Sequence, residues 1–350
     1  MDLPAGTYSF SYSRDMAIVR SRSQWGMAIL FMIVLLSLPL FAGSYFLNLI
    51  IMIAINAVAV HGLSLLTGYC GQISIGHAAF VAIGAYTSAI LATNLGFPFW
   101  IALPLAGLVT GLVGMIFGLP SLRVKGFYLV MATLAAQFIV HFILMLDPFG
   151  LTGGTFGVAA PAPKLGGIVF NSAQSFYYIA IGACILATFL AKNLARMDVG
   201  RAFTAIRDND IAAEVMGINL YRNKLLAFFL GCYFAGIAGS LFVHYMGTVS
   251  PDRFTLLQSI WFLGMLIIGG LGSTSGVIFG VAFVQLLEEL TVILSTSLGQ
   301  AFPMLAMQAA AFSQIIFGLV VVLFLVFEPR GLAHRWQLLK ASYRLWPFSY

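Results

Sequence analysis

Residues 68–77 read Gly-Tyr-Cys-Gly-Gln-Ile-Ser-Ile-Gly-His and interrupt a long apolar region with small and polar side chains. Inside a lipid bilayer every backbone N–H and C=O group needs a partner, so irregular backbone is tolerated only where protein or a wet cavity surrounds it. An interrupted apolar segment is also a good sequence indication of a solute site in a membrane domain. The stretch therefore predicts a broken membrane helix whose candidate pathway residues are Gly68, Gln72, Ser74, Gly76 and His77.

Each of these residues also has a purely structural interpretation. Gln72 and His77 either line a pathway or cap the ends of the broken helix, and the sequence does not decide between the two roles. Ser74 suits a capping role better than a solute contact. The glycines of the stretch are more typical of a bend or of close helix approach than of solute binding.

The composition of the whole chain is that of a membrane protein. Its 350 residues are 61% hydrophobic and only 8% charged, whereas a soluble domain carries about 25% charged residues. The formal charge of +6 comes from basic residues scattered singly among apolar segments, which fits membrane orientation and offers no patch for nucleic acid. The three cysteines have unrelated spacings, which predicts free thiols and neither a disulfide framework nor a metal site.

Ten segments approach the length of about 20 apolar residues that crosses the hydrocarbon core of a bilayer. The sequence therefore predicts an all-α integral membrane protein of about ten transmembrane helices, one or two of them interrupted. The eighth segment is short and ends in Gly269-Gly-Leu-Gly272, which is typical of a broken helix. The expected spans are 26–42, 45–66, 78–94, 98–120, 126–146, 172–192, 225–246, 256–271, 276–295 and 304–327.

The basic residues support this arrangement. With the N-terminus in the cytoplasm, fifteen of the 17 Lys and Arg residues fall inside, and only Lys164 and Arg253 fall outside, as the positive-inside rule requires. A cleaved signal peptide at the N-terminus is the alternative interpretation. The expected organisation is a cytoplasmic tail at 1–25, a single transmembrane domain at 26–327 with an external loop at 147–171 and a cytoplasmic loop at 193–224, and a cytoplasmic tail at 328–350.

The cytoplasmic loop holds most of the polar chemistry of the chain. Three N-cap formers at 208–210 precede the run 211–216, and Gly217 is a natural helix stop. The pattern predicts two short helices, at about 201–206 and 211–216. A solvated connector needs no exposed apolar side chains, whereas a docking surface does. Four such side chains are expected here: Phe203, Ile206, Val215 and Met216.

Within this loop, Ala212-Ala213-x-x-x-Gly217 is similar to the core of the EAA-type loop in membrane subunits of bacterial ABC importers, where the loop contacts the ATPase. Ile211 stands where the usual pattern has Glu, a departure that one subgroup shares in kind. The resemblance implies a short cytoplasmic coupling-helix loop. Its implied ATPase-coupling residues are Arg201, Phe203, Arg207, Asp210, Ala212, Ala213, Glu214 and Gly217.

An ordered set of motifs from about residue 45 to 332 resembles the permeases of branched-chain amino-acid ABC transporters, most of all the LivM-type subunit. The set comprises the 68–77 stretch with Gly84-Ala-Tyr86, Leu151-Thr-Gly-Gly154, Gly200-Arg-Ala-Phe203 with Ala205-Ile-Arg207, Ala235-Gly-Ile-Ala-Gly239, Gly269-Gly-Leu-Gly-Ser273 and Glu328-Pro-Arg-Gly-Leu332.

This resemblance implies a permease subunit of a binding-protein-dependent importer for branched-chain or other hydrophobic amino acids in the bacterial plasma (inner) membrane. The implied partners are two cytoplasmic ATP-binding subunits, a second and different permease subunit, an external substrate-binding protein and membrane lipid. The sequence has no Gly-Lys pair and hence no Walker A loop. We therefore expect this chain to bind no cofactor and not to be an enzyme, with ATP used by the partner subunits.

Glu288 and Glu289 fall inside the ninth expected span, where an ionisable residue is a functional candidate. They could meet a substrate ammonium group, but their place nearer the outer end favours interfacial solvation or docking of the binding protein. Together with Thr152, Gly153 and Gly154 of the external loop they form the candidate docking set.

Other functions stay open at this point. An importer for urea or short amides shares the motif set, and the pore residues do not separate the two substrate classes. An ion-coupled secondary carrier would need charged residues deep in its helices, and most of the expected spans have none. A membrane-embedded enzyme would need a convergent acid, base or metal set. Small residues four apart, such as Gly107 and Gly111, predict close packing within one bundle or a face for a second subunit.

Overall fold

The computed structural model describes residues 22–122, 126–148, 150–165, 167–299, 309–328 and 330–345. Four parts of the chain lie outside the described residues: most of the expected N-terminal tail, the loop residues Arg123 and Lys125, the start of the tenth expected span and the last five residues.

The longer helices are α2 (Arg22–Phe41), α3 (Ser44–Leu63), α4 (His77–Thr93), α5 (Phe99–Gly118), α6 (Phe127–Leu146), α7 (Ala173–Arg196), α8 (Asp198–Asp208), α10 (Leu220–Met246), α11 (Leu256–Gly269), α12 (Thr274–Gly299), α14 (Ala309–Phe327) and α15 (Gly331–Leu345).

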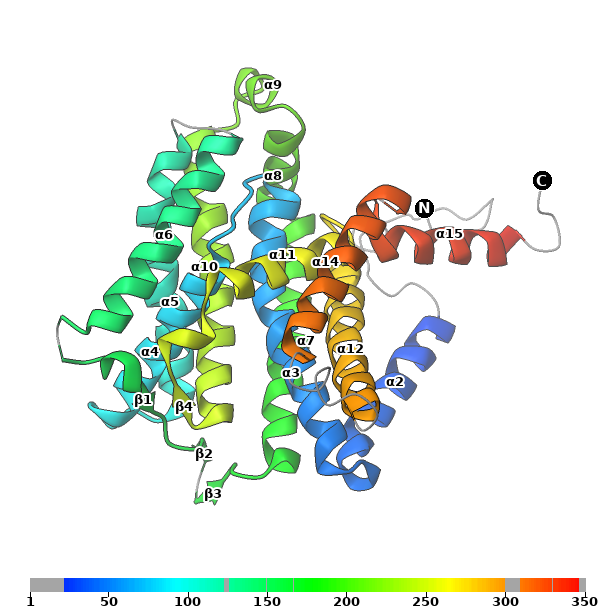
Figure 1. Ribbon diagram of the computed structural model, residues 1–350. Helices are drawn as coiled ribbons and strands as arrows, with labels where there is room; N and C mark the ends of the chain where they lie inside the picture. Colours follow the sequence, from blue (N-terminus) through cyan, green and yellow to red (C-terminus); the bar gives the residue numbers. More distant parts are fainter. Residues whose placement is uncertain are drawn as a thin grey trace.

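Short elements lie at the two ends of this helical bundle (Figure 1). The short helix α9 (Asp210–Val215) stands with α8 at one end, and the two-residue strands lie at the opposite end. Strand β1 (Val158–Ala159) pairs antiparallel with β4 (Thr248–Val249), and β2 (Lys164–Leu165) pairs with β3 (Ile168–Val169). The remaining elements are η1 (Ser64–Tyr69), η2 (Leu119–Leu122), η3 (Gly154–Phe156) and η4 (Pro251–Arg253).

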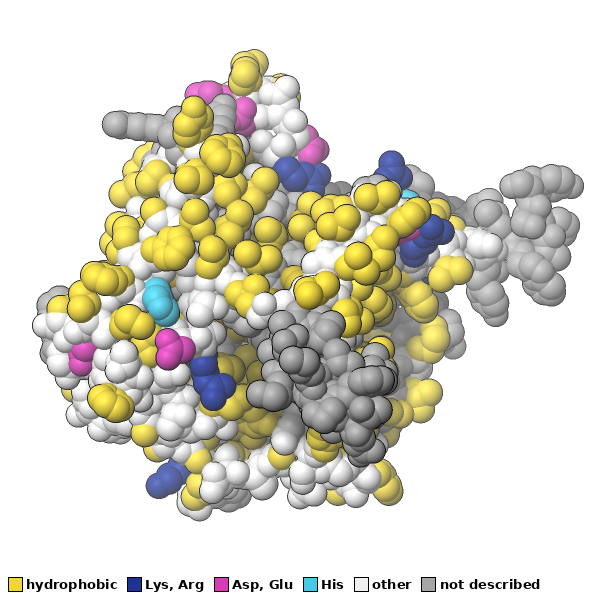
Figure 2. Space-filling view, viewed as in Figure 1, with side chains coloured by type: hydrophobic (Ala, Val, Ile, Leu, Met, Phe, Trp, Pro, Cys, Tyr) yellow, Lys and Arg dark blue, Asp and Glu magenta, His cyan; other side chains and the backbone are white. Residues whose placement is uncertain are grey.

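The predicted all-α membrane fold is confirmed, but the number of about ten spans is not. Within the described ranges, 6 helices are long and apolar enough to cross a membrane, or up to 7 if the bent pair α14 and α15 counts as one. Helix α4 has 17 residues and α11 has 14, so both are shorter than a full span. Hydrophobic side chains cover much of the visible flank of the molecule, as a lipid-facing surface requires (Figure 2).

Helices α3 and α10 form the centre of the bundle, because both are buried along most of their length and α10 packs against α3, α4 and α5. Small residues make these contacts close. A Cβ atom on Gly84 of α4 would lie 2.3 Å from the Cα atom of Gly236 in α10. The glycine row of α5 meets Phe228, Phe229 and Tyr233 of α10. For this row, the four-residue spacing serves packing within the chain.

Helix α11 is the short eighth segment that the sequence predicts. At 1.5 Å per residue its 14 residues reach only about 21 Å, less than the roughly 30 Å of the hydrocarbon core. It ends at Gly270, whose φ of 112° is accessible to glycine and strained for other residues. The chain then turns through Leu271 and Gly272 into α12, so the turn at 270–272 joins two helices that pack against each other.

Candidate functional site

The interrupted segment begins with a change in helix type. Helix α3 continues into η1, a π-helix, and residues 70–76 then run without regular structure to α4. Side chains from other helices satisfy the irregular backbone: the N–H of Ile75 donates to Thr133 Oγ1 at 3.1 Å, and that of Ala78 donates to Ser259 Oγ at 2.9 Å. The break therefore sits in a protein environment that supplies partners for its backbone, as lipid burial demands.

The predicted pathway residues are packed inside the protein at this break. Gln72 is buried, and its Nε2 atom lies 3.4 Å from Cys70 Sγ. Ser74 is fully buried, and a Cβ atom on Gly76 would meet the carbonyl oxygen of Thr133. His77 Nε2 lies 2.8 Å from the carbonyl oxygen of Ala59. A pathway role for these side chains stays a prediction, since the structure buries Gln72, Ser74 and His77 inside the protein.

A cavity of about 620 Å³ lies next to the residues that pack against His77. Ala59 lines it, and so does Phe262, whose ring meets His77 edge-on with centroids 6.0 Å apart. His77 therefore lies one layer behind the cavity surface. Helices α3, α11 and α12 contribute most of the lining. The lining residues include Met52, Ile55, Asn56, Val81, Phe242, Arg253, Leu257, Gln258, Trp261, Met265, Gln285, Glu288, Val292 and Gln314.

Three polar side chains of this lining form a connected row between α3 and α12. Asn56 Nδ2 donates to Gln285 Oε1 at 2.9 Å, and Gln285 Nε2 donates to Glu288 Oε2 at 3.2 Å. Asn56 is buried, whereas Gln285 and Glu288 are half-buried. The row holds the Glu288 carboxylate in a fixed orientation at the surface of a cavity whose lining residues are mostly apolar.

The two neighbouring glutamates of α12 have different surroundings. Glu288 lines the cavity, whereas Glu289 accepts a hydrogen bond from the Tyr45 hydroxyl of α3. Consecutive residues of an α-helix point about 100° apart, which accounts for the different contacts of the two carboxylates. The docking role predicted for the pair stays a prediction, and the geometry separates their contacts.

The loop at 193–224 forms the two predicted helices, α8 and α9, although α8 extends beyond the predicted range at both ends. Asn209 caps α9 by accepting from the N–H of Ala212 at 3.1 Å. Gly217 ends it with φ 88°, and an ion pair between Asp210 and Lys224 (3.7 Å) ties its first turn to α10.

The expectation of four exposed apolar side chains on this loop is wrong for two of them. Phe203 and Ile206 are buried, 1% and 5% exposed, because α8 packs this face against α7, α10 and η1. Val215 and Met216 are each 82% exposed. Phe203 thus anchors α8 to the bundle, and the exposed apolar surface lies at the end of α9, with Ile211 also exposed.

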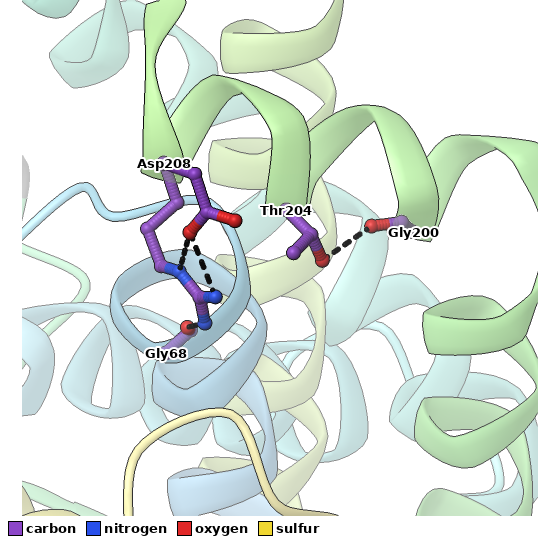
Figure 3. Close-up of polar contacts among 5 residues, drawn as sticks. Gly68, Gly200, Thr204 and Asp208 are labelled. Carbon is purple, nitrogen blue, oxygen red and sulfur yellow. Dashed lines mark hydrogen bonds and ion pairs between the residues drawn. The ribbon is translucent and has the colours of Figure 1, made fainter.

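Arg207 joins this loop to the interrupted segment by a hydrogen bond to Gly68, and Figure 3 shows Gly68 lying close to Asp208 at the end of α8. Its Nη1 atom donates to the carbonyl oxygen of Gly68 at 2.9 Å, while Nε and Nη2 both donate to Asp208 Oδ1. A Cβ atom on Gly71 would lie 2.8 Å from Arg207 Cγ, and one on Gly272 would lie 3.1 Å from Nη1. One side chain of α8 therefore contacts the π-helix, the irregular segment and the turn at 270–272.

A comparison with family models matches residues 45–325 to the branched-chain amino acid transport system / permease component family. The chain belongs to this family. It is 34% identical to the high-affinity branched-chain amino acid transport system permease protein LivM of Salmonella typhimurium, and 33% identical to LivM of Escherichia coli, over 77% of this chain in each case. The chain spans 66% of the length of both relatives. The autoinducer 2 import system permease protein LsrC of Escherichia coli is 26% identical over 65% of this chain and 64% of its own length.

Sequence reasoning missed one residue at the start of the 147–171 loop in this family member. Asp147 follows α6 with φ 48°, and its carboxylate accepts the N–H groups of Leu151, Thr152 and Gly153 at 2.7, 2.9 and 3.0 Å. The pKa of this carboxyl is lowered below its usual value, and the backbone hydrogen bond from Thr152 is the largest cause. The predicted docking residues Thr152, Gly153 and Gly154 are thus shaped by an acidic residue, and an Asp six residues before a Gly-Gly pair was the available signal.

Proposed function

We propose that this family member is a membrane-spanning permease subunit of an ATP-driven importer for branched-chain or other hydrophobic amino acids. Family membership and the names of the more similar relatives support the transport role and the substrate class. The observation that carries the coupled mechanism is the contact of Arg207 with the carbonyl oxygen of Gly68. This contact joins a loop with an exposed apolar end to the break in a central membrane helix.

In this mechanism, partner ATPase subunits bind the exposed end of α9 from the cytoplasm, and this chain itself binds no cofactor. Val215 and Met216 are suited to fill pockets on a partner, because interface anchors are apolar groups that become buried on binding. Movement of α8 would displace Arg207, and with it the π-helix and the turn at 270–272. Nucleotide would then bias a two-state equilibrium between inward-open and outward-open forms.

The cavity fits a small solute with an apolar part. Its volume of about 620 Å³ lies in the usual range of ligand pockets, about 300–1,000 Å³. Aliphatic and aromatic side chains such as Ile55, Trp261 and Met265 make up most of its wall. An importer for urea or short amides would gain little from such a wall, so the cavity favours hydrophobic amino acids.

Purification and uptake test this proposal together. The tagged chain, extracted from its own membranes in mild detergent, should carry two ATP-binding subunits and a second permease, identified by mass spectrometry. Deletion of its gene should abolish ATP-dependent uptake of radiolabelled leucine, isoleucine or valine. A chain that purifies alone and moves solute down an ion gradient in liposomes would be a secondary carrier, and the proposal would be wrong.

A further inference from the structure

We propose that the cavity holds the substrate as a zwitterion, with Glu288 facing the ammonium group and Arg253 facing the carboxylate. This inference rests on the proposed amino-acid transport and names the residues of this chain that recognise the solute. It departs from the sequence-based expectation for Glu288, which favoured a place at the outer surface.

The charges of the cavity match those of an amino acid. Among the lining residues that the structure describes, Arg253 is the one cation and Glu288 the one anion. The two lie on different elements, η4 and α12, so separate parts of the chain bring opposite charges to the cavity lining: Arg253 is exposed and Glu288 is half-buried. A zwitterion carries one group of each sign, whereas a neutral amide carries none. The pair therefore gives the site a reason to prefer amino acids.

Glu288 is oriented before any solute arrives. Gln285 donates to its Oε2 atom, and Asn56 in turn donates to Gln285. This row of amide groups fixes the carboxylate without neutralising it, because an amide supplies a hydrogen bond and no charge. A carboxylate held in this way loses little freedom when it binds an ammonium group, and preorganisation of this kind strengthens binding.

Most of the remaining lining suits an aliphatic side chain. Phe242, Trp261, Phe262, Met265 and Val292 present apolar surface in the same cavity. The unbranched Met side chain adapts to irregular shapes, so the wall can accept several aliphatic side chains of different branching. The backbone groups of the solute and its side chain thus meet different parts of the lining, which is what selection of a class of amino acids requires.

The first experiment measures leucine uptake in cells whose own copy of the gene carries each substitution, with the amount of protein in the membrane measured by immunoblot. Glu288→Gln keeps the size of the side chain and removes its charge. We expect it to lower the maximal uptake rate about tenfold or more, the effect of losing a charge-assisted hydrogen bond. Glu288→Asp should retain more activity than Glu288→Gln, and Arg253→Lys more than Arg253→Gln.

Glu289→Gln provides the comparison that separates this proposal from a docking role for the pair. The zwitterion site predicts a much larger loss for Glu288→Gln than for Glu289→Gln, because Glu289 contacts Tyr45 and is absent from the lining. Equal losses in the two variants, or normal uptake with Glu288→Gln, would overturn it. Wild-type cells that fail to take up leucine would instead contradict the proposed function itself.

A binding readout completes the test. Leucine bearing a diazirine on its side chain, photolysed with the detergent-purified complex, should label peptides from 256–269 and 274–299. Excess leucine should prevent labelling, whereas isopentylamine and 4-methylpentanoate, which lack the carboxylate or the ammonium group, should not. Labelling that persists in both Glu288→Gln and Arg253→Gln, or that falls only outside the cavity lining, would contradict the proposal.

Discussion

Gly68 has no room for a side chain, and this makes it a sharp test of the interrupted segment at the scale of one residue. A Cβ atom there would lie 2.6 Å from the backbone nitrogen of Gly272 and 3.2 Å from Ser64 Oγ. Gly68→Ala should therefore force the π-helix away from the turn at 270–272, at a cost of about 1–3 kcal/mol for overpacking. The expected result is a lower melting temperature in detergent, together with slower uptake because the Arg207 contact is displaced.

Gly182→Ala is the matched control for this variant. Gly182 lies within α7, and a Cβ atom there would meet nothing within 4 Å. Alanine is favoured over glycine inside a helix by roughly 0.5–1 kcal/mol, so the melting temperature should stay or rise. If both variants melted alike and transported alike, the close approach of Gly68 to the turn would have no role in the protein.

At the scale of single elements, local signals in the sequence predicted where helices break and begin, whereas packing between distant segments decided which side chains are buried. The break after Gly68 and the start of α9 at Asn209 follow from glycine and from capping side chains, which act within a few residues. The inward face of α8 does not: Phe203 is buried because α7, α10 and η1 cover it. Likewise, adjacent glutamates in α12 must diverge, but only the packed structure shows that Glu288 lines the cavity.

The exposed end of α9 supplies the prediction that belongs to an element. Val215→Ser combined with Met216→Ser removes two apolar side chains that are each 82% exposed, so the fold of the chain should hardly change. Recovery of ATPase subunits with the tagged chain should fall about tenfold or more if these side chains are interface anchors. Co-purification measured by quantitative mass spectrometry checks this.

Val169→Ser is the control for the α9 variant, because Val169 is 48% exposed and lies in β3 at the opposite end of the bundle. Recovery of the ATPase subunits should be unaffected by it. Normal recovery with both variants would place the contact elsewhere on the cytoplasmic surface and remove α9 as the docking element.

For the whole molecule, the orientation in the membrane ties all of these sites together. Lys164 and Val215 lie in β2 and α9, at opposite ends of the bundle. In the sequence, the 24-residue helix α7 and the helix α8 lie between them. Of these two helices α7 is long and apolar enough to span, whereas α8 has 11 residues. A cysteine replacing Lys164 and one replacing Val215 should therefore react on opposite sides of the membrane.

A membrane-impermeant maleimide applied to intact cells should label Lys164→Cys, and it should label Val215→Cys only after the membrane is opened. The unsubstituted chain gives the background, which should be low because Cys70 and Cys232 are buried and the half-buried Cys184 lies within the apolar helix α7. The reverse pattern would put α9 outside the cell, out of reach of any ATPase, and would overturn the coupling mechanism. Labelling of both from one side would mean that α7 does not cross the bilayer, and the external loop, the cavity and α9 could not then form one route across it.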